Sequence, residues 1–424
     1  MRAIIISIGD ELILGQVVDT NSAWLSARLT ECGVLTSYHK TVPDDLDAIV
    51  HAVCNAKEDA EWILLTGGLG PTPDDLTRQA MSEVLQSPLV LHDLSLKRIE
   101  SFFQARGRTM SKSNRLQAMY PRDSEILDNS IGTAPGLKGR VGMATIFAFP
   151  GVPIEMKAMF ENSVITLLSA DKVSGIRAGR SIATATLNTF VVGESKISKE
   201  LGDLMARGCN PVVGTTASGG IVSVRIRSDF DTVEKANAML EQTAEKIRQR
   251  LGKAIFSHGD ETLQDTVGQL LLEQHKKVAT AESCTAGLLG KMLTEQAGSS
   301  AWYVGGWIVY DNELKIKQLG LSEDMLLIEG AVSKLAAKSM AEEAVKRTSA
   351  DYALALTGIA GPGGGTSEKP VGTVWIALGK RQADGITAEA NRFVFSGNRE
   401  SIRVRAAKTA LNLLRLDLIA GNMA

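Results

Sequence analysis

The chain has 424 residues, of which 44% are hydrophobic and 22% are charged. This composition is ordinary for a globular protein and excludes a disordered or fibrous chain, and the length predicts two or three domains. The 46 basic and 48 acidic side chains give a formal net charge of −2. Because no overall field would attract the protein to nucleic acid or to an anionic membrane, we expect neither as a partner.

Cysteine usage and the first residues bear on the cellular compartment. The four cysteines are far apart and form no CxxC pair, which argues against a disulfide framework and a thiolate zinc site. The apolar run at the N-terminus reaches Asp10 and Glu11 at once, so it is too short for a signal peptide or a membrane span. These features predict a cytoplasmic protein.

Residues 1–170 are predicted to form the first domain. Short β-branched runs alternate with helical periods, which is typical of βαβ units around a mostly parallel sheet. Asn21 can begin one helix, which Gly33 ends, and Asp44 or Asp45 can cap the next. The strands are expected at 3–8, 62–66 and 144–149.

Residues 171–258 are predicted to form a small α+β domain. Its pattern is a strand, a hairpin that turns at Gly219 and Gly220, a long helix and a last strand. No chemistry stands out in this region, and a structural role is the simplest interpretation. The elements are expected at 184–192, 212–226, 233–251 and 254–257.

Residues 259–424 are predicted to form a second α/β domain, unrelated to the first. It begins with a helix at 262–275 and ends with a long helix at 399–418. The fold class is therefore α/β, with two unrelated α/β domains that have mostly parallel sheets and are joined by a small α+β domain. The strands are expected at 277–281, 304–310, 352–356, 372–378 and 391–395.

The stretch GGLGPTPDDLTR follows the predicted strand 62–66 directly. Glycines in a loop before a helix let backbone N–H groups approach a phosphate closely. The spacing matches neither a Walker A loop nor GxGxxG, so a tight turn without a ligand remains an alternative. The candidate phosphate-binding residues are Gly67, Gly68, Gly70, Thr72 and Thr77.

Several carboxylates follow the same strands. Crowded around a phosphate, they would repel each other and the ligand unless a divalent cation lay between them. The alternative for each residue alone is a helix cap. The candidate metal ligands are Asp10, Asp44, Asp75 and Glu155.

The motifs GDELILGQVVDTN, VPDD, TGGLGPTPDDLTR, NSIGTAPG and FPGVPIEM, in this order, resemble the N-terminal domain of the CinA family. That domain is similar to the molybdopterin-binding fold. The resemblance implies a nucleotide site that includes Asp44 and Asp75, and ADP-ribose pyrophosphatase activity that depends on a divalent metal such as Co²⁺ or Mg²⁺.

A second candidate site begins in GSSAWYVGGWIVYDNELK, which contains Ser300 and Lys315. All five histidines precede the C-terminal motifs, so a histidine base from this region is excluded. A lysine can act as the base when burial lowers its pKa. Tyr310 could hydrogen-bond either partner, and an ordinary surface lysine beside a loop serine is the alternative.

Three further motifs converge on this candidate site. AESCTAG is a strand-to-helix turn whose N–H groups and hydroxyls, including those of Ser283 and Thr285, could bind phosphate. LTGIAGPGGG contributes Thr357 and Gly358 after another strand. SGNRESIR places Arg399 and Arg403 one helical turn apart, where they could hold a phosphate or a carboxylate.

These C-terminal motifs resemble the CinA C-terminal domain, the nicotinamide-nucleotide amidase family. The resemblance implies hydrolysis of nicotinamide mononucleotide to nicotinate mononucleotide and ammonia without a cofactor. It assigns the nucleophile to Ser300 and the base to Lys315. The resemblance also implies a site lined by Ser283, Tyr310, Thr357 and Arg399. Many relatives have a glycine where this chain has Ala286.

The expected function is thus an amide hydrolase with a second, metal-dependent ADP-ribose pyrophosphatase site. The expected partners are these small nucleotides and a second copy in a homodimer. Two alternatives stay open: a nucleotide sensor without turnover, and a pterin-nucleotide transferase or carrier. A DNA-uptake role gains no support from the balanced charge.

Overall fold

The structure is a computed structural model that describes residues 2–168 and 181–421. The chain divides into two compact units, Met1–Ala183 with Ser228–Asn237, and Thr184–Arg227 with Ala238–Ala424. The predicted boundary at residue 170 lies outside the described residues. Each sheet is described by itself below.

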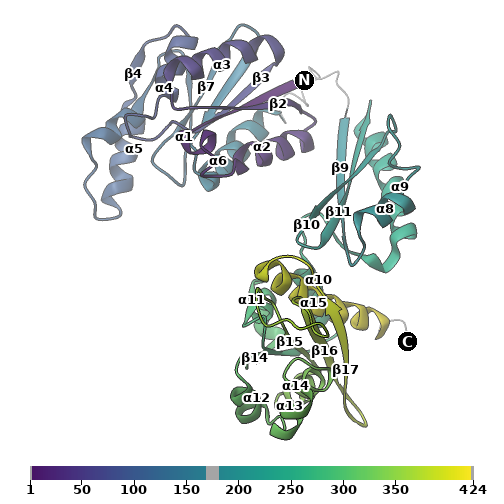
Figure 1. Cartoon of the computed structure of the whole chain (residues 1–424). Coiled ribbons are helices and arrows are strands. Elements are labelled where there is room, and N and C mark those ends of the chain that lie inside the picture. The colour runs from purple at the N-terminus through teal and green to yellow at the C-terminus, as the bar shows by residue number, and fades with distance from the viewer. Residues whose placement is uncertain (1, 169–180, 422–424) are drawn as a thin grey trace. The chain divides into compact units, whose positions relative to one another are not determined.

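The N-terminal unit is built on a six-stranded sheet with the order β2-β1-β3-β8-β7-β6 (Figure 1). The strands β1, β2, β3 and β8 are parallel, whereas β7 and β6 run antiparallel at one edge. The fold is therefore α/β with a mostly parallel sheet. The strands are β1 (Arg2–Ile8), β2 (Leu35–Val42), β3 (Trp62–Thr66), β6 (Glu125–Leu127), β7 (Gly136–Val141) and β8 (Ala144–Phe149).

Buried side chains on both faces of β1 explain why helices cover this sheet on both sides. Ile4 and Ile6 pack with residues of α3 (Leu46–Asp59) and α4 (Thr77–Val84). Ile5 packs on the opposite face with residues of α2 (Thr20–Glu31) and α6 (Pro153–Met159). The carboxyl ends of β1, β3 and β8 are consequently left to loops.

Local signals in this unit are mostly confirmed. Asp45 caps α3 by accepting a hydrogen bond from the Ala48 N–H at 2.9 Å, and Gly33 follows α2 with φ +81°. Asp19 rather than Asn21 caps α2, because its carboxylate accepts from the Ser22 N–H. The sequence analysis missed several elements: α1 (Asp10–Ile13), β2, β6, β7, α5 (Asp93–Gln104) and the short pair β4 (Leu89–Leu91) and β5 (Met119–Pro121).

Residues 181–258 contain a four-stranded sheet with the order β10-β11-β9-β12. Strands β10 (Val212–Ser218) and β11 (Ile221–Phe230) form the predicted hairpin, and Gly219 and Gly220 at its turn both have positive φ. Helices α8 (Glu194–Glu200) and α9 (Val233–Leu251) complete this α+β region. The other strands are β9 (Ser181–Phe190) and β12 (Ile255–His258).

The C-terminal sheet has the order β14-β13-β15-β16-β17. Strands β13 (Val278–Glu282), β14 (Tyr303–Ile308) and β15 (Tyr352–Gly358) are parallel, so their carboxyl ends meet at one edge. Strands β16 (Thr373–Gln382) and β17 (Gly385–Val394) continue the sheet antiparallel. Strand β17 begins earlier than the predicted run at 391–395.

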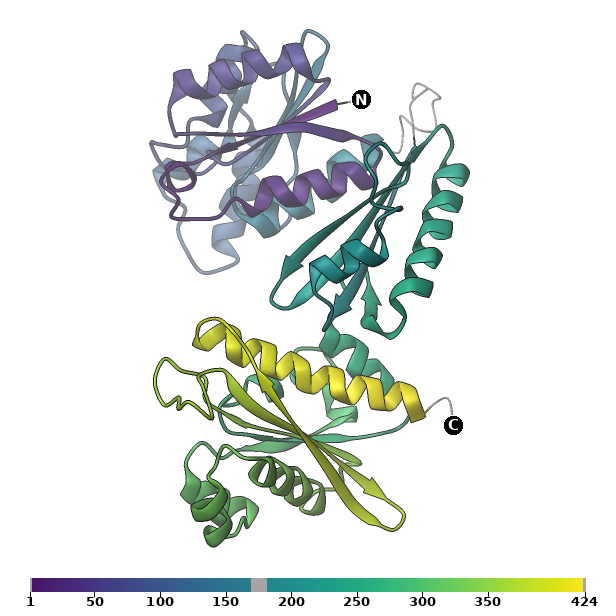
Figure 2. The ribbon, with the colours of Figure 1, turned by 45° about the vertical axis from the view of Figure 1, so that its right-hand side comes forward.

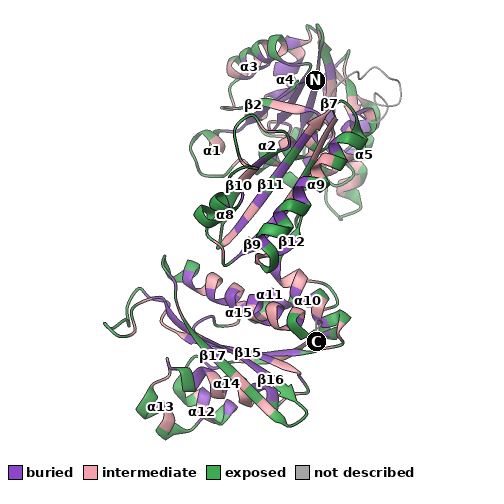
Figure 3. Ribbon diagram, turned by 90° about the vertical axis from the view of Figure 1, so that its right-hand side faces the viewer, coloured by how far each residue is buried: buried purple, intermediate pink, exposed green. Residues whose placement is uncertain are grey.

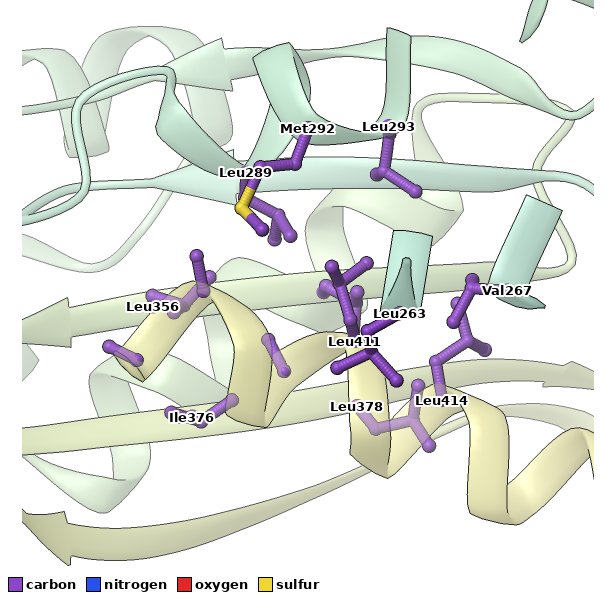
Figure 4. Packing of buried hydrophobic residues seen from close by; sticks show 14 of the residues in the cluster. Leu263, Val267, Leu289, Met292, Leu293, Leu356, Ile376, Leu378, Leu411 and Leu414 are labelled. Atoms are coloured by element: carbon purple, nitrogen blue, oxygen red, sulfur yellow. The ribbon is translucent and has the colours of Figure 1, made fainter. Parts of the chain in front are cut away.

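Helices cover both faces of this sheet (Figure 2). The last helix, α15 (Arg399–Gly421), lies on one face together with α10 (Leu263–Glu273) and α11 (Leu288–Thr294). Their leucines and Met292 pack against Leu356, Ile376 and Leu378 of the sheet (Figure 4). The other face carries α12 (Asn312–Leu319), α13 (Glu323–Glu329) and α14 (Lys334–Lys346). Strand β15 is buried along almost its whole length (Figure 3).

Among residues 2–168 and 181–421, no helix combines the length and the apolar character needed to cross a membrane.

Candidate functional site

Lys315 lies on α12, just past the carboxyl end of β14. Asp311 caps this helix by accepting from the Glu313 N–H at 2.7 Å. The lysine is only 1% exposed, and its Nζ donates to the Tyr310 carbonyl at 3.1 Å. Burial lowers the pKa of the Lys315 amine, and no carboxylate in the described part of the chain forms an ion pair with it. These surroundings favour the neutral amine, which can accept a proton.

The turn that begins at Ser283 reaches the same edge of the sheet. Its strand, β13, lies beside β14, and the Val309 N–H donates to the Glu282 carbonyl at 2.8 Å. Ser283, which is 8% exposed, is held from the other side because its N–H donates to the Leu356 carbonyl at 2.9 Å. The structure therefore places the Ser283 turn at the same sheet edge as Lys315.

Ser300 lies elsewhere, which corrects the predicted pairing with Lys315. It is exposed in a short 3-10 helix, Ser299–Ala301, before β14, whereas Lys315 follows the other end of that strand. Six strand residues separate these ends by roughly 16 Å at the usual rise per residue. Sequence proximity suggested a dyad that the extended strand between the two residues prevents.

Tyr310 and Arg399 form the rim of this edge. The Arg399 guanidinium donates through Nη2 to the Tyr310 hydroxyl at 2.9 Å and through Nη1 to the Gly361 carbonyl at 2.7 Å. Both side chains are exposed. The Tyr310 hydroxyl, which was expected to hydrogen-bond Ser300 or Lys315, instead accepts from Arg399, so a cationic group lies at this rim.

The other predicted lining residues make contacts within the protein. The Thr357 hydroxyl donates to the Ala331 carbonyl at 2.7 Å, and a Cβ at Gly358 would lie 2.6 Å from the Thr373 carbonyl oxygen. Thr285 is completely buried, and its carbonyl accepts from Arg403 Nη2 at 2.6 Å. Arg399 and Arg403 thus bind two different loops and do not form the expected fork.

The N–H groups after the Ser283 turn are not free for a phosphate. This corrects the expectation that they bind one. The Glu282 carboxylate accepts from the N–H groups of Gly287 and Leu289, both at 3.0 Å, and of Gly290 at 2.8 Å. Sequence reasoning missed Glu282, although a charged residue that ends a strand of otherwise small and apolar residues is a signal. Ala286 has φ +49°, a conformation that favours glycine. This agrees with the glycine that many relatives have at this position.

Cys284 is excluded as a nucleophile by its surroundings. The side chain is 5% exposed, and burial raises the pKa of its thiol to about 12. A thiol with that pKa forms almost no thiolate near neutral pH. Cys284 instead packs in the hydrophobic core of the C-terminal unit.

A second candidate site lies in the N-terminal unit, at the carboxyl ends of β1, β3 and β8. A cavity of about 440 Å³ is lined there by Gly67, Gly68, Gly70, Asp44 and Glu155, among others. A Cβ at Gly67, which has φ +112°, would collide with the Ile8 carbonyl. The glycine is therefore required for the close approach of two strand ends.

The predicted phosphate-binding hydroxyls donate inside the glycine loop. The Thr77 hydroxyl donates to the Gly67 carbonyl at 2.8 Å, and the Thr72 hydroxyl donates to Asp75. The Asp75 carboxylate also accepts from the N–H groups of Gly70 at 2.7 Å and of Thr72 at 2.8 Å. Much of the predicted anion cradle is thus filled by the protein's own carboxylate.

The four predicted metal ligands do not form one set. No cluster of three or more metal-binding side chains occurs among the described residues. Glu155 accepts from Asn129 Nδ2 at 2.6 Å, and Asp75 is engaged in the loop. Asp10 and Asp44 alone face each other, since each backbone N–H donates to the other's carboxylate, at 2.9 and 3.2 Å.

The electrostatics of Asp44 fit a cation in this corner of the cavity. Burial raises the pKa of the Asp44 carboxyl, and the nearby charges of Asp10, Glu11 and Asp74 raise it further. A divalent ion would relieve this repulsion. Among the described residues the paired donors are thus Asp10 and Asp44, of which only Asp44 lines the cavity.

Arg78 is a second residue that sequence reasoning missed. It is 3% exposed and donates to the carbonyls of Leu69 and Gly70. The Arg78 guanidinium therefore fixes the path of the glycine loop through these two carbonyl groups. Its place at the end of the DDLTR motif was the available signal.

Comparisons with known proteins agree with this architecture. Residues 4–170 match the family described as "Probable molybdopterin binding domain", residues 184–257 match "Damage-inducible protein CinA KH domain", and residues 260–418 match "CinA C-terminal domain".

Relatives match over nearly the full length of the chain. A CinA-like protein of Dictyoglomus thermophilum is 38% identical over 99% of this chain and 100% of its own length. A CinA-like protein of Syntrophomonas wolfei is 37% identical over 99% of both chains. A solved structure of CinA from Thermoplasma acidophilum is 32% identical and covers 39% of this chain and 97% of that one, with a TM-score of 0.37. The chain belongs to the CinA family.

Proposed function

We propose that the C-terminal site hydrolyses the carboxamide of nicotinamide mononucleotide, releasing nicotinate mononucleotide and ammonia without a cofactor. The observation that carries this proposal is the buried Lys315 amine, whose pKa is lowered by burial, beside the turn of a buried serine. We assign the nucleophile to Ser283, because it shares the sheet edge with the lysine. A serine activated by a neutral amine is a known arrangement for amide hydrolysis.

In the proposed mechanism, neutral Lys315 accepts the proton of the Ser283 hydroxyl while Oγ attacks the carboxamide carbon. The N–H group of Cys284, which makes no backbone hydrogen bond within the described ranges, is available to the oxyanion. The Lys315 ammonium then donates its proton to the departing amine, and ammonia leaves. Water attacks the acyl-serine and loses its proton to Lys315, which returns a proton to Ser283 Oγ as that oxygen leaves and nicotinate mononucleotide is released.

We further propose that Arg399 binds the substrate phosphate. It is the exposed cation of the rim, and its guanidinium is oriented by Gly361 and Tyr310. The amides of Gly287, Leu289 and Gly290 cannot replace it, because the Glu282 carboxylate occupies them. The site should therefore favour the nucleotide over nicotinamide riboside.

The test is to incubate the protein with nicotinamide mononucleotide and with nicotinamide riboside, measuring ammonia and identifying the product by mass spectrometry. Faster turnover of the phosphorylated substrate is expected. No ammonia from either substrate, with ligand binding retained, would favour a nucleotide sensor instead. Equal turnover of both would contradict the role of Arg399.

For the N-terminal cavity we propose metal-dependent hydrolysis of ADP-ribose. The support is the glycine loop together with the paired carboxylates of Asp10 and Asp44. When bound, a divalent ion such as Co²⁺ or Mg²⁺ would neutralise charge on the pyrophosphate. Asp10 and Asp44 would hold the ion, and the glycines would let the backbone approach the substrate.

Mass spectrometry tests this second proposal. AMP should appear from ADP-ribose only with added Mg²⁺ or Co²⁺, and a chelator should abolish it. Tight binding of a pterin nucleotide without AMP release would instead favour the transferase or carrier alternative.

A further inference from the structure

Glu282 is a buried carboxylate with an unusual position. It is the last residue of β13, it is 1% exposed, and the proposed nucleophile Ser283 is its neighbour in the chain. Its two oxygens accept three backbone N–H bonds, from Gly287, Leu289 and Gly290. No ion pair to Glu282 occurs within the described residues, so the backbone amides alone offset its charge.

Gly290 and Tyr303 pack closely around this carboxylate. A Cβ at Gly290 would lie 2.7 Å from the Tyr303 hydroxyl and 3.4 Å from Glu282 Oε1. The Tyr303 hydroxyl is itself held by the Thr280 hydroxyl at 2.8 Å. Three converging N–H donors match the acceptor oxygens of a carboxyl group.

These bonds close a short loop of chain. Residues 283–286 leave the sheet at Glu282, and the next amides return to the side chain of the same residue. The path of this loop decides where the Ser283 hydroxyl points, because the Ser283 N–H is fixed to β15 and the following residues are fixed to Glu282.

We propose that Glu282 is a positioning residue of the amidase: its carboxylate locks the loop so that the Ser283 hydroxyl faces Lys315. This inference rests on the proposed amidase function. Glu282 contacts neither the substrate nor the reacting atoms, so its loss should lower turnover and not substrate binding.

The variant Glu282→Gln tests this. The amide keeps the size of the side chain, but its NH₂ group must face one of the N–H donors, which loosens the loop. We expect kcat for nicotinamide mononucleotide to fall about 100-fold, as for a small misplacement of a reacting group, with KM nearly unchanged. Glu295→Gln at the C-cap of α11, where Glu295 pairs with Lys291, is the matched control and should behave as wild type.

A second variant and a second readout separate positioning from folding. Gly290→Ala should crowd Tyr303 and Glu282 and reproduce part of the kcat loss, with circular dichroism confirming that each variant is folded at the assay temperature. Labelling of Ser283 by an aryl sulfonyl fluoride, detected by peptide mass, should slow in Glu282→Gln and Gly290→Ala but not in the control.

The outcomes are distinct. Wild-type kcat and labelling in folded Glu282→Gln would overturn the inference while leaving the amidase proposal intact, as would an equal loss in Glu295→Gln. If the wild-type protein releases no ammonia, the amidase proposal fails, and the labelling rates alone then decide whether Glu282 orients the serine.

Discussion

In both candidate sites a carboxylate accepts hydrogen bonds from backbone N–H groups, but the two carboxylates differ in how deeply they are buried. In each, a turn at the carboxyl edge of a parallel sheet gives its N–H groups to an internal carboxylate, Asp75 in the N-terminal unit and Glu282 in the C-terminal unit. Asp75 is half-buried at the wall of an open cavity, whereas Glu282 is fully buried. A turn of this kind is therefore no evidence of a bound phosphate by itself.

The sites also pose opposite electrostatic problems. Carboxylates crowd the N-terminal cavity and raise the pKa of Asp44, after the effect of burial. A single amine is buried in the C-terminal site, and burial lowers the pKa of Lys315. In the proposed functions, a cation would complete the first arrangement, whereas the second would accept a proton without one. Four changes, taken from the largest expected effect to the smallest, test this contrast.

Replacing each candidate serine by alanine should give the largest difference in ammonia release. Ser283→Ala should reduce ammonia release by roughly 10⁴-fold or more, because it removes the attacking oxygen. Ser300→Ala is the matched control and should stay close to wild type, since that hydroxyl lies at the other end of β14. The reverse ranking in a steady-state assay would restore the pairing suggested by the sequence.

Replacing the buried amine tests the base. Lys315→Met keeps an unbranched side chain of similar length and should lower kcat about 10³-fold, the usual worth of a general base. Wild-type kcat/KM should rise with pH along a limb that lies below 10.5, the ordinary pKa of lysine. A rate that is independent of pH in this range would contradict the role of the neutral amine.

The same variant has a stability signature. Because the folded-state pKa of Lys315 is lowered, the unfolded chain binds more protons between that pKa and 10.5. The unfolding free energy of the wild type should therefore rise with pH relative to Lys315→Met over this window. Denaturant titrations of both proteins across neutral and alkaline pH provide the measurement.

Removing the rim cation should affect binding more than chemistry. Arg399→Gln is expected to raise KM for nicotinamide mononucleotide about 10- to 100-fold, the usual worth of a charge-assisted hydrogen bond. Turnover of nicotinamide riboside should be unaffected, which makes that substrate the internal control. An equal loss on both substrates would instead indicate that Arg399 only supports the Gly361 loop.

The smallest effect is expected at the paired carboxylates. Asp44→Asn removes a charge that is unfavourable at neutral pH, because a raised carboxyl pKa costs stability as the group ionises. Without metal the variant should be more stable by less than about 1 kcal/mol, since solvent screens this partly exposed group. Added Mg²⁺ should raise the unfolding temperature, measured by calorimetry, of the wild type only. An equal rise in both proteins would exclude Asp44 as a ligand.

The architecture around each site follows from short-range patterns. The apolar runs of β1, β3 and β13, the cap Asp45 and the glycine turns were all readable from neighbouring residues. The sequence left open whether Lys315 is a buried base or an ordinary surface lysine, and the structure buries it. Strands such as β2 and β6 were missed because their polar and exposed residues break the alternation.

The sequence by itself determined the α/β class, the two glycine turns and the residue types available at each edge, because these depend on local periodicity and turn chemistry. Only the tertiary structure decided which serine lies at the same sheet edge as Lys315, since that depends on which strand ends lie side by side in the parallel sheet. It also decided that Asp75 and Glu282 fill the amide groups a ligand could have used. A buried N–H group takes the nearest acceptor, and spacing along the chain does not reveal which acceptor that is.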